Sequence, residues 1–150
     1  MTAPALLDVQ ALRVSFAGKE VVRGINFSVA AGEKLALVGE SGSGKTLTAL
    51  SLLGLVQGAQ TSGHAIFRGA AEADLLALSE RDLRAVRGRD IAMIFQEPMT
   101  ALNPLFSVGN QIAEVLQLKE GLSPVQAHQA AVALLAETGI PEAERRSHSF

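Results

Sequence analysis

Apolar and polar residues alternate along two stretches near the start of the chain. Residues 6–16, LLDVQALRVSF, are rich in large apolar and β-branched side chains, and residues 21–29, VVRGINFSV, alternate over most of their length. A period of two is typical of strands. The pairs Ala17-Gly18 and Ala31-Gly32 provide a turn after each stretch. The pattern therefore predicts two strands of antiparallel type.

Two other short runs are apolar without alternation. They are residues 34–39, KLALVG, and residues 90–96, DIAMIFQ. A continuous run of this length is typical of a strand buried on both faces, as in a parallel sheet. The almost uncharged residues 45–56 follow the first run and predict a helix. After a loop at residues 58–63, residues 64–68 predict a short strand.

Helix-start signals mark the remainder of the chain. A serine N-cap followed three residues later by Asp or Gln predicts a capping box, as at Ser79 and Ser123, and a proline directly after the serine favours the first helical position. The predicted helices are one that begins at Ser79, one that Ser107 can cap and that runs to about Leu118, and one from Ser123-Pro124 to Gly139. This order of elements predicts an α/β fold with an appended helical part.

The composition excludes several classes of protein. The chain has 150 residues, of which 48% are hydrophobic and 19% charged, which predicts one globular domain. The absence of cysteine excludes disulfide frameworks, thiolate zinc sites and cysteine nucleophiles, and a formal charge of −2 argues against a nucleic-acid partner. No apolar stretch reaches the roughly 18 residues of a membrane-spanning helix, and no basic segment typical of a signal peptide opens the chain. His64, His128 and His148 are scattered, none pairs with an acidic residue at metal-ligand spacing, and all three are expected at the surface.

The main chemical signal is GESGSGKT at residues 39–46, which fits the phosphate-binding pattern G-x-x-x-x-G-K-[ST]. Backbone N–H groups can surround a triphosphate only where Cβ atoms do not intrude, and the following helix aims its positive end at the phosphates. Lys45 is expected to reach the β and γ oxygens, and the Thr46 hydroxyl to ligate Mg²⁺. A glycine-rich turn that merely precedes Lys-Thr is the alternative, but an apolar strand pattern ends where this motif begins. The predicted binding residues are Gly39, Glu40, Ser41, Gly42, Ser43, Gly44, Lys45 and Thr46.

Two features favour adenine over guanine as the base of the nucleotide. Residues 1–38 precede the motif, whereas in small kinases and small GTPases the loop usually lies close to the N-terminus. No Asn-Lys-x-Asp run, which reads guanine, occurs anywhere in the chain. ATP is therefore the expected ligand.

Three stretches of the chain together resemble the ATP-binding subunit of ABC transporters, and within that family the peptide/nickel importer group. They are residues 32–46, residues 87–104 (RGRDIAMIFQEPMTALNP), and the opening LRVSF followed by VVRGINFSVAAGE. The resemblance covers nearly the whole chain. It implies a P-loop NTPase fold, with a RecA-like core, an antiparallel β subdomain and the start of a helical subdomain.

The resemblance implies roles for two residues outside the motif. Phe16 lies where the family has an aromatic side chain that stacks on adenine; the alternative is a core position in its strand. Gln96 matches the Q-loop glutamine, which approaches Mg²⁺ and the attacking water; the alternative is a polar strand end in solvent. Glu97 is interpreted as a loop residue near a membrane partner and not as the catalytic base.

Other elements of the family are missing from the sequence. It contains no run of four apolar residues followed by Asp-Glu (Walker B), no Leu-Ser-Gly-Gly-Gln signature and no late switch histidine. Residues 1–150 are therefore expected to be the N-terminal part of a nucleotide-binding domain, incomplete and inactive as an ATPase by itself.

For the intact protein, the resemblance implies ATP hydrolysis that energises the import of peptides or a related small solute. The implied partners are permease subunits contacted by residues 98–118, a second ATP-binding subunit or half in a head-to-tail dimer and, indirectly, a solute-binding protein. The implied location is peripheral, at the cytoplasmic face of the cell membrane. A soluble non-transport ABC-type ATPase and a module that binds nucleotide without cleaving it are the alternatives.

Overall fold

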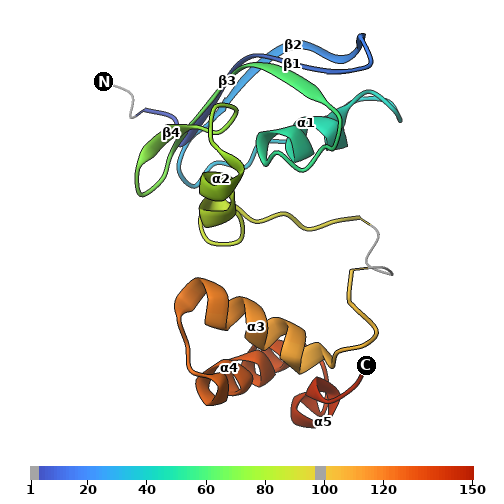
Figure 1. Ribbon diagram of the computed structural model, residues 1–150, viewed down its shortest axis with the longest axis vertical. Coiled ribbons are helices and arrows are strands. Elements are labelled where there is room, and N and C mark those ends of the chain that lie inside the picture. The colour runs from blue at the N-terminus through green and yellow to red at the C-terminus, as the bar shows by residue number, and fades with distance from the viewer. Residues whose placement is uncertain (1–3, 97–100) are drawn as a thin grey trace. The chain divides into compact units, whose positions relative to one another are not determined.

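The structure is a computed structural model that describes residues 4–96 and 101–150 (Figure 1). It divides into two compact units, Met1–Ala92 and Met93–Phe150. The described part of the first unit contains four strands and two helices, and that of the second unit contains three helices. The predicted α/β class with an appended helical part is confirmed.

An antiparallel sheet forms most of the first unit. Its strands are β1 (Leu7–Phe16), β2 (Lys19–Val29), β3 (Gln60–Arg68) and β4 (Glu72–Asp74). Their order across the sheet is β2-β1-β3-β4, and each neighbouring pair is antiparallel. The two strands predicted at the start of the chain are therefore confirmed, whereas the short β4 has no counterpart in the sequence prediction.

β3 begins earlier than the sequence pattern predicted. Its polar residues Gln60, Thr61 and Ser62 pair with β1, although the prediction placed them in a loop. Gly63 has a φ of 99°, and a Cβ there would lie 2.5 Å from the carbonyl oxygen of Ala11 in β1. Backbone pairing, with a glycine at the point of closest approach, extends this strand where hydrophobicity gives no signal.

The core of the first unit is formed by residues of β1, β2 and β3 together with Leu75, which follows β4. Helix α1 (Lys45–Leu52) lies beside the sheet and contacts β1 (Figure 1). Leu12 and Val14 of β1 are fully buried. The buried cluster consists of Val9, Leu12, Val14, Val22, Ala65, Phe67 and Leu75. Burial of these apolar side chains stabilises the sheet against which α1 packs.

Helix α2 (Glu80–Val86) is connected to the end of α1 through Arg87. The Arg87 guanidinium donates to the carbonyl oxygens of Leu53 at 2.7 Å and Gly54 at 3.3 Å, and pairs with the Glu80 carboxylate at 2.7 Å. The hydrogen bond from Arg87 lowers the pKa of the Glu80 carboxyl. These contacts satisfy carbonyl groups that follow the last turn of α1. The helix predicted over residues 45–56 accordingly ends at Leu52.

The second unit consists of α3 (Val108–Glu120), α4 (Pro124–Glu137) and α5 (Ala143–Ser147). Small residues let these helices approach: a Cβ at Gly109 of α3 would lie 2.8 Å from the Cβ of Ser147 in α5. The buried alanines of α3 and α4 are Ala113, Ala127 and Ala131. Among the described helices, none combines the length and the apolar character that crossing a bilayer would require.

The serine caps predicted from the sequence are confirmed. The side-chain oxygens of Ser79, Ser107 and Ser123 each accept a hydrogen bond from a backbone N–H of the first helical turn. Ser123 and Gln126 complete a capping box, and Pro124 follows the cap directly. α5, by contrast, has five residues and was not predicted, because a single turn leaves no hydrophobic period to detect.

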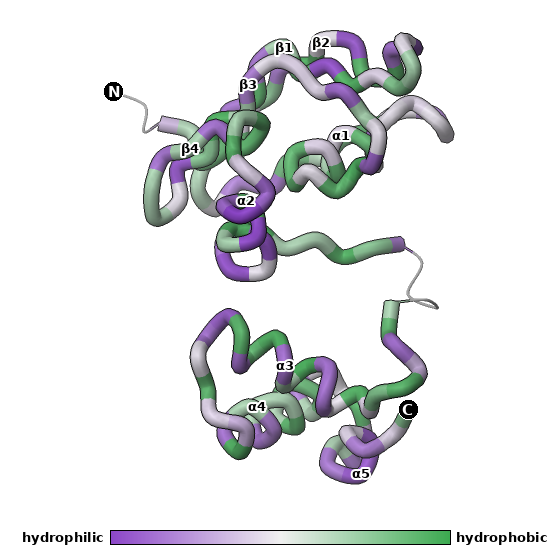
Figure 2. The backbone as a smooth tube through the Cα atoms, viewed as in Figure 1, coloured by the Kyte–Doolittle hydropathy of each residue, from purple (hydrophilic) through white to green (hydrophobic). Residues whose placement is uncertain are grey.

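The two segments predicted as doubly buried strands are not strands in the described part of the chain. Residues 34–39 are exposed throughout, and residues 90–96 contribute only a single bridge between Ile91 and Arg87. Val38 is 87% exposed and Ile94 is 96% exposed. Figure 2 shows the stretch after α2 as mostly hydrophobic. The prediction is wrong here because hydrophobicity alone does not make a strand, and no described residue supplies the hydrogen-bonded neighbour that each would need.

Candidate nucleotide-binding site

The GESGSGKT segment folds into a loop that surrounds the end of the Lys45 side chain. The Lys45 Nζ donates to the carbonyl oxygens of Gly39 at 2.8 Å and Glu40 at 2.7 Å, and to the Ser43 Oγ at 3.3 Å. The backbone N–H of Ser43 donates to the Glu40 carbonyl at 3.2 Å, which closes a turn inside the loop. The ammonium group is therefore held at the centre of the predicted phosphate-binding loop.

Two glycines give the loop its shape. Gly42 and Gly44 have φ angles of 79° and 91°, in the left-handed region that side chains other than glycine rarely adopt. A Cβ at Gly44 would also lie 3.2 Å from both the carbonyl oxygen of Val21 and the Cγ2 of Val22 in β2. Gly44 is the N-cap of α1, so it lets the first turn of the helix approach β2.

The N-terminus of α1 has the properties of an anion-binding site. Gly44 provides no side-chain cap, and the first turn contains no acidic residue. The first N–H groups of a helix lack partners within the helix, and the helix dipole is positive at this end. Thr46 in the first turn is exposed, so its hydroxyl is accessible beside these N–H groups. The arrangement suits a phosphate chain.

An open hollow of about 600 Å³ lies between β2 and the loop. Its basic residues are Lys19, Arg23 and Lys45, and its acidic residue is Glu20. The excess of positive charge favours an anionic ligand. A second hollow, of about 150 Å³, is lined by residues 42–47 at the loop itself. The full lining of the larger hollow is Lys19, Glu20, Val21, Val22, Arg23, Ile25, Leu37, Val38, Gly39, Gly42, Ser43, Lys45 and Thr48.

The structure brings together residues 39–46 in one loop, and Phe16 and Gln96 belong to other segments of the chain. Phe16, at the end of β1, is half-buried and packs against the sheet core, and it is not part of the lining of the larger hollow. Gln96 is exposed and belongs to the second unit. The roles of both residues stay predictions. Glu97 lies outside the described residues.

Sequence reasoning missed the contribution of β2 to the hollow. Residues 19–23 of this strand all line the hollow, together with residues of the loop. The sequence pattern predicted that the strand begins at Val21, so Lys19 and Glu20 lay outside it. Nothing local in the sequence indicated that the strand meets residues 39–45, because the contact joins segments some twenty residues apart.

The expectation that no histidine pairs with an acidic residue at metal-ligand spacing is wrong for His128 and His148, and His64 also has an acidic partner. His64 Nδ1 lies 2.7 Å from the Asp74 Oδ2 in the first unit. In the second unit, His128 and His148 both lie 3.7 Å from the Glu144 Oε1. The pair Glu144 and His148, four residues apart, was visible in the sequence as one helical turn, whereas the other two pairings depend on the fold. His64 and His148 are exposed, as predicted, and His128 is half-buried.

Sequence comparison with known proteins identifies the family of this chain. The profile of the ABC transporter family matches residues 22–149, a span that contains the predicted phosphate-binding loop. The chain belongs to the ABC transporter family. Nucleotide binding is the property that its ATPase domain implies.

Individual ABC transporter proteins are similar over nearly the whole chain. A probable peptide ABC transporter ATP-binding protein of Sinorhizobium fredii is 47% identical, over 99% of this chain and 45% of its own length. The oligopeptide transport ATP-binding protein OppD of Bacillus subtilis is 46% identical, over 97% of this chain and 42% of its own length. OppD of Salmonella typhimurium is 44% identical, over 99% and 45% respectively. The chain thus spans about half the length of the curated relatives that it matches.

Proposed function

We propose that this chain binds ATP and is the N-terminal part of the nucleotide-binding domain of an ATP-driven importer of peptides or a related small solute. The observation that carries the proposal is the Lys45 ammonium at the centre of a loop with two left-handed glycines, at the start of a helix without an acidic first turn. Relatives named as peptide transport ATP-binding proteins support the choice of solute. They also argue against a soluble, non-transport ABC-type ATPase.

Mg²⁺ is the second proposed component of the site. The exposed Thr46 hydroxyl beside the accessible N–H groups of α1 fits a hard cation that bridges phosphate oxygens, because Mg²⁺ prefers oxygen ligands. Gln96 is the proposed second contact with the ion, through its side-chain amide oxygen. When bound, Mg²⁺ neutralises charge on the transferring phosphoryl group. Phe16 is proposed to stack on the adenine.

Permease subunits are the proposed membrane partners. Several large apolar side chains between residues 102 and 118 are exposed, including Leu105 at 78% and Leu118 at 75%. Exposed apolar surface of this kind is typical of protein interfaces. We infer a peripheral position at the cytoplasmic face of the membrane, a second ATP-binding subunit or half in a head-to-tail dimer and, indirectly, a solute-binding protein.

The proposed function is tested at two levels. Calorimetric titration of the 150-residue chain with ATP, with and without Mg²⁺, is expected to show one saturable site. Absence of saturable binding by folded chain would contradict the assignment of the loop. Transport is tested by co-purification of the intact subunit with the permease subunits encoded beside it. Failure to bind any permease would contradict the importer role without contradicting ATP binding.

A further inference from the structure

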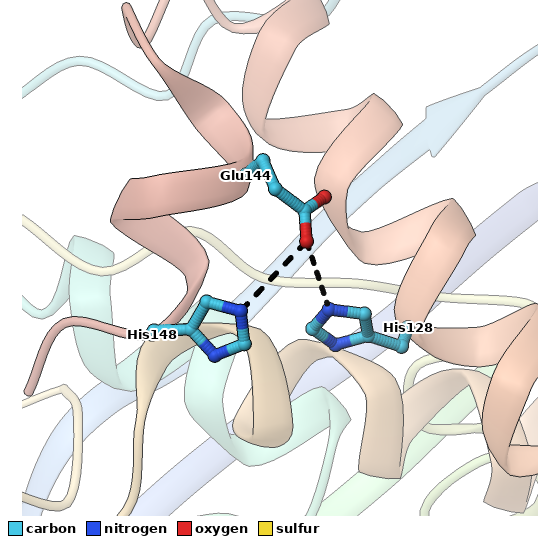
Figure 3. A group of neighbouring side chains, drawn as sticks. All are labelled: His128, Glu144 and His148. Atoms are coloured by element: carbon cyan, nitrogen blue, oxygen red, sulfur yellow. Dashed lines mark ion pairs between the residues drawn. The ribbon is translucent and has the colours of Figure 1, made fainter.

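A cluster of three side chains in the second unit joins α4 to α5 (Figure 3). His128 comes from α4, Glu144 from α5, and His148 is the C-cap residue of α5. The Glu144 Oε1 lies 3.7 Å from the Nε2 of His128 and 3.7 Å from the Nε2 of His148. In Figure 3 both imidazole rings present a nitrogen to the same carboxylate oxygen. The cluster is outside the proposed nucleotide site.

The distances within the cluster fit metal coordination better than direct hydrogen bonding. N–H···O hydrogen bonds have donor–acceptor distances of about 2.7–3.2 Å, so both 3.7 Å separations are too long. Zn²⁺ binds imidazole nitrogen and carboxylate oxygen at about 2.0–2.2 Å, which places two ligands of a tetrahedral ion roughly 3.4 Å apart. All three ligand atoms already lie within 4.8 Å of one another. Small side-chain rotations would bring them around one ion.

The backbone holds the three residues in this arrangement independently of their own contacts. Glu144 and His148 are four residues apart and share one face of α5. α5 is anchored by Ser147, which is fully buried, and α4 by Ala127 and Ala131, which are also fully buried. The ligand atoms remain accessible, because His128 and Glu144 line an open hollow of about 510 Å³.

We propose that His128, Glu144 and His148 form a binding site for a divalent first-row transition metal ion. Two imidazoles and one carboxylate are a donor set that such ions take, and three protein ligands leave the remaining positions to water. The bound ion links α5 to α4 and stabilises their packing. The site does not depend on nucleotide binding or on the importer role.

Zn²⁺ is the probe for a calorimetric test on the metal-free, nucleotide-free 150-residue chain. One ion is expected to bind per chain, and His128→Ala or His148→Ala to weaken binding at least tenfold. Glu144→Gln is expected to weaken it less, because an oxygen donor remains while its charge is lost. His64→Ala is the matched control. His64 pairs only with the Asp74 carboxylate, which is a smaller donor set than the proposed site, so Zn²⁺ affinity is expected to be unchanged in this variant.

Nuclear magnetic resonance of the imidazoles gives a second readout that needs no variant at the site. The chain contains three histidines, and the His64 signals are identified by their loss in His64→Ala. Zn²⁺ is expected to shift the other two sets of signals together, saturating at one equivalent. Absence of saturable binding, or equal shifts of all three histidines, would overturn the proposal. Circular dichroism shows whether a variant that loses Zn²⁺ binding is still folded. If it is not folded, the Zn²⁺-induced shifts in the nuclear magnetic resonance spectrum of the wild-type chain decide whether the site exists.

Discussion

The Nζ of Lys45 donates a 2.8 Å hydrogen bond to the carbonyl oxygen of Gly39, six residues earlier, where the proposed phosphate-binding loop begins. This hydrogen bond keeps the ammonium group inside the loop. Phosphate oxygens carry more negative charge than a carbonyl, so they are better partners for the same donor. Under the proposed function, a triphosphate would therefore take over these hydrogen bonds of Lys45.

Replacing Lys45 is expected to weaken ATP binding at least tenfold. A charge-assisted hydrogen bond contributes roughly 1.5–3 kcal/mol, which corresponds to about a tenfold change in affinity or more. Lys45→Ala would be compared by calorimetry with Lys34→Ala, a matched loss of charge at an exposed lysine outside the loop. Equal affinities of the two variants would contradict the role of Lys45.

The Thr46 hydroxyl is expected to matter only when Mg²⁺ is present. Thr46→Ala removes a proposed oxygen ligand of the ion but leaves the backbone N–H groups of the loop in place. ATP affinity should therefore fall in Mg²⁺ and stay the same in EDTA. Thr46→Ser keeps the hydroxyl and should retain the Mg²⁺ effect. A loss of affinity that is equal in both buffers would show that Thr46 supports the loop and does not ligate the ion.

The features predicted correctly from the sequence all depend on residues that are close together in the chain. Ser123, Pro124 and Gln126 specify the start of α4 within four positions, and the structure shows the resulting capping box. The loop of residues 39–46 is specified in the same way, by glycines at fixed intervals before Lys-Thr. Local rules of this kind hold because each N–H group involved finds its hydrogen-bond acceptor within one turn, and each left-handed φ angle is allowed by the glycine at that position.

The features that were missed depend on partners far away in the sequence. The polar start of β3 is a strand because β1 pairs with it, and β2 lines the hollow because residues 37–45, far along the chain, lie across from it. Residues 34–39 and 90–96 show the opposite error, since they have the hydrophobicity of strands without a neighbour among the described residues. His128 meets Glu144 only because α5 packs against α4.

Asp74 is expected to make the first unit less stable in acid. Burial raises the pKa of its carboxyl, but hydrogen bonds from the Ala65 N–H, from His64 and from the Leu76 N–H outweigh burial, and the pKa is lowered. A lowered pKa in the folded state stabilises the protein above the unfolded pKa of about 3.9, and this contribution is lost as the pH falls through the folded value. Asp74→Asn should therefore lower the free energy of unfolding by about 1–2 kcal/mol at pH 7.

Urea unfolding across a pH series checks this expectation. The difference between wild type and Asp74→Asn should shrink as the pH falls below about 4, because the unfolded state takes up a proton there, and it should vanish once the folded carboxyl is protonated at lower pH. His64→Ala keeps the two backbone hydrogen bonds of Asp74 and should cost less at neutral pH. A difference in the free energy of unfolding that does not change with pH would show that the charge of the Asp74 carboxylate does not stabilise the fold.

Phe16 is expected to affect nucleotide affinity without selecting the base. Stacking of an aromatic ring on a purine contributes roughly 1–3 kcal/mol and tolerates either purine, so Phe16→Ala should weaken ATP and GTP binding alike and Phe16→Tyr should change little. Phe16 also packs against the sheet core, so affinity must be measured on folded protein. Phe27→Ala is the control, because Phe27 packs against the same core and does not line the hollow. Equal effects of the two alanine variants on affinity would assign Phe16 to the core alone.

The 150-residue chain is expected to show no ATPase rate above background. Hydrolysis requires Mg²⁺ held on two sides, a base for the attacking water and stabilisation of charge on the transferring phosphoryl group. This sequence supplies Lys45, Thr46, the loop N–H groups and Gln96, but no run of four apolar residues followed by Asp-Glu and no signature motif. A steady phosphate-release assay on purified chain, with Lys45→Ala as the background control, measures the rate. Turnover that persists through further purification and is absent in Lys45→Ala would show that a catalytic base lies within residues 1–150.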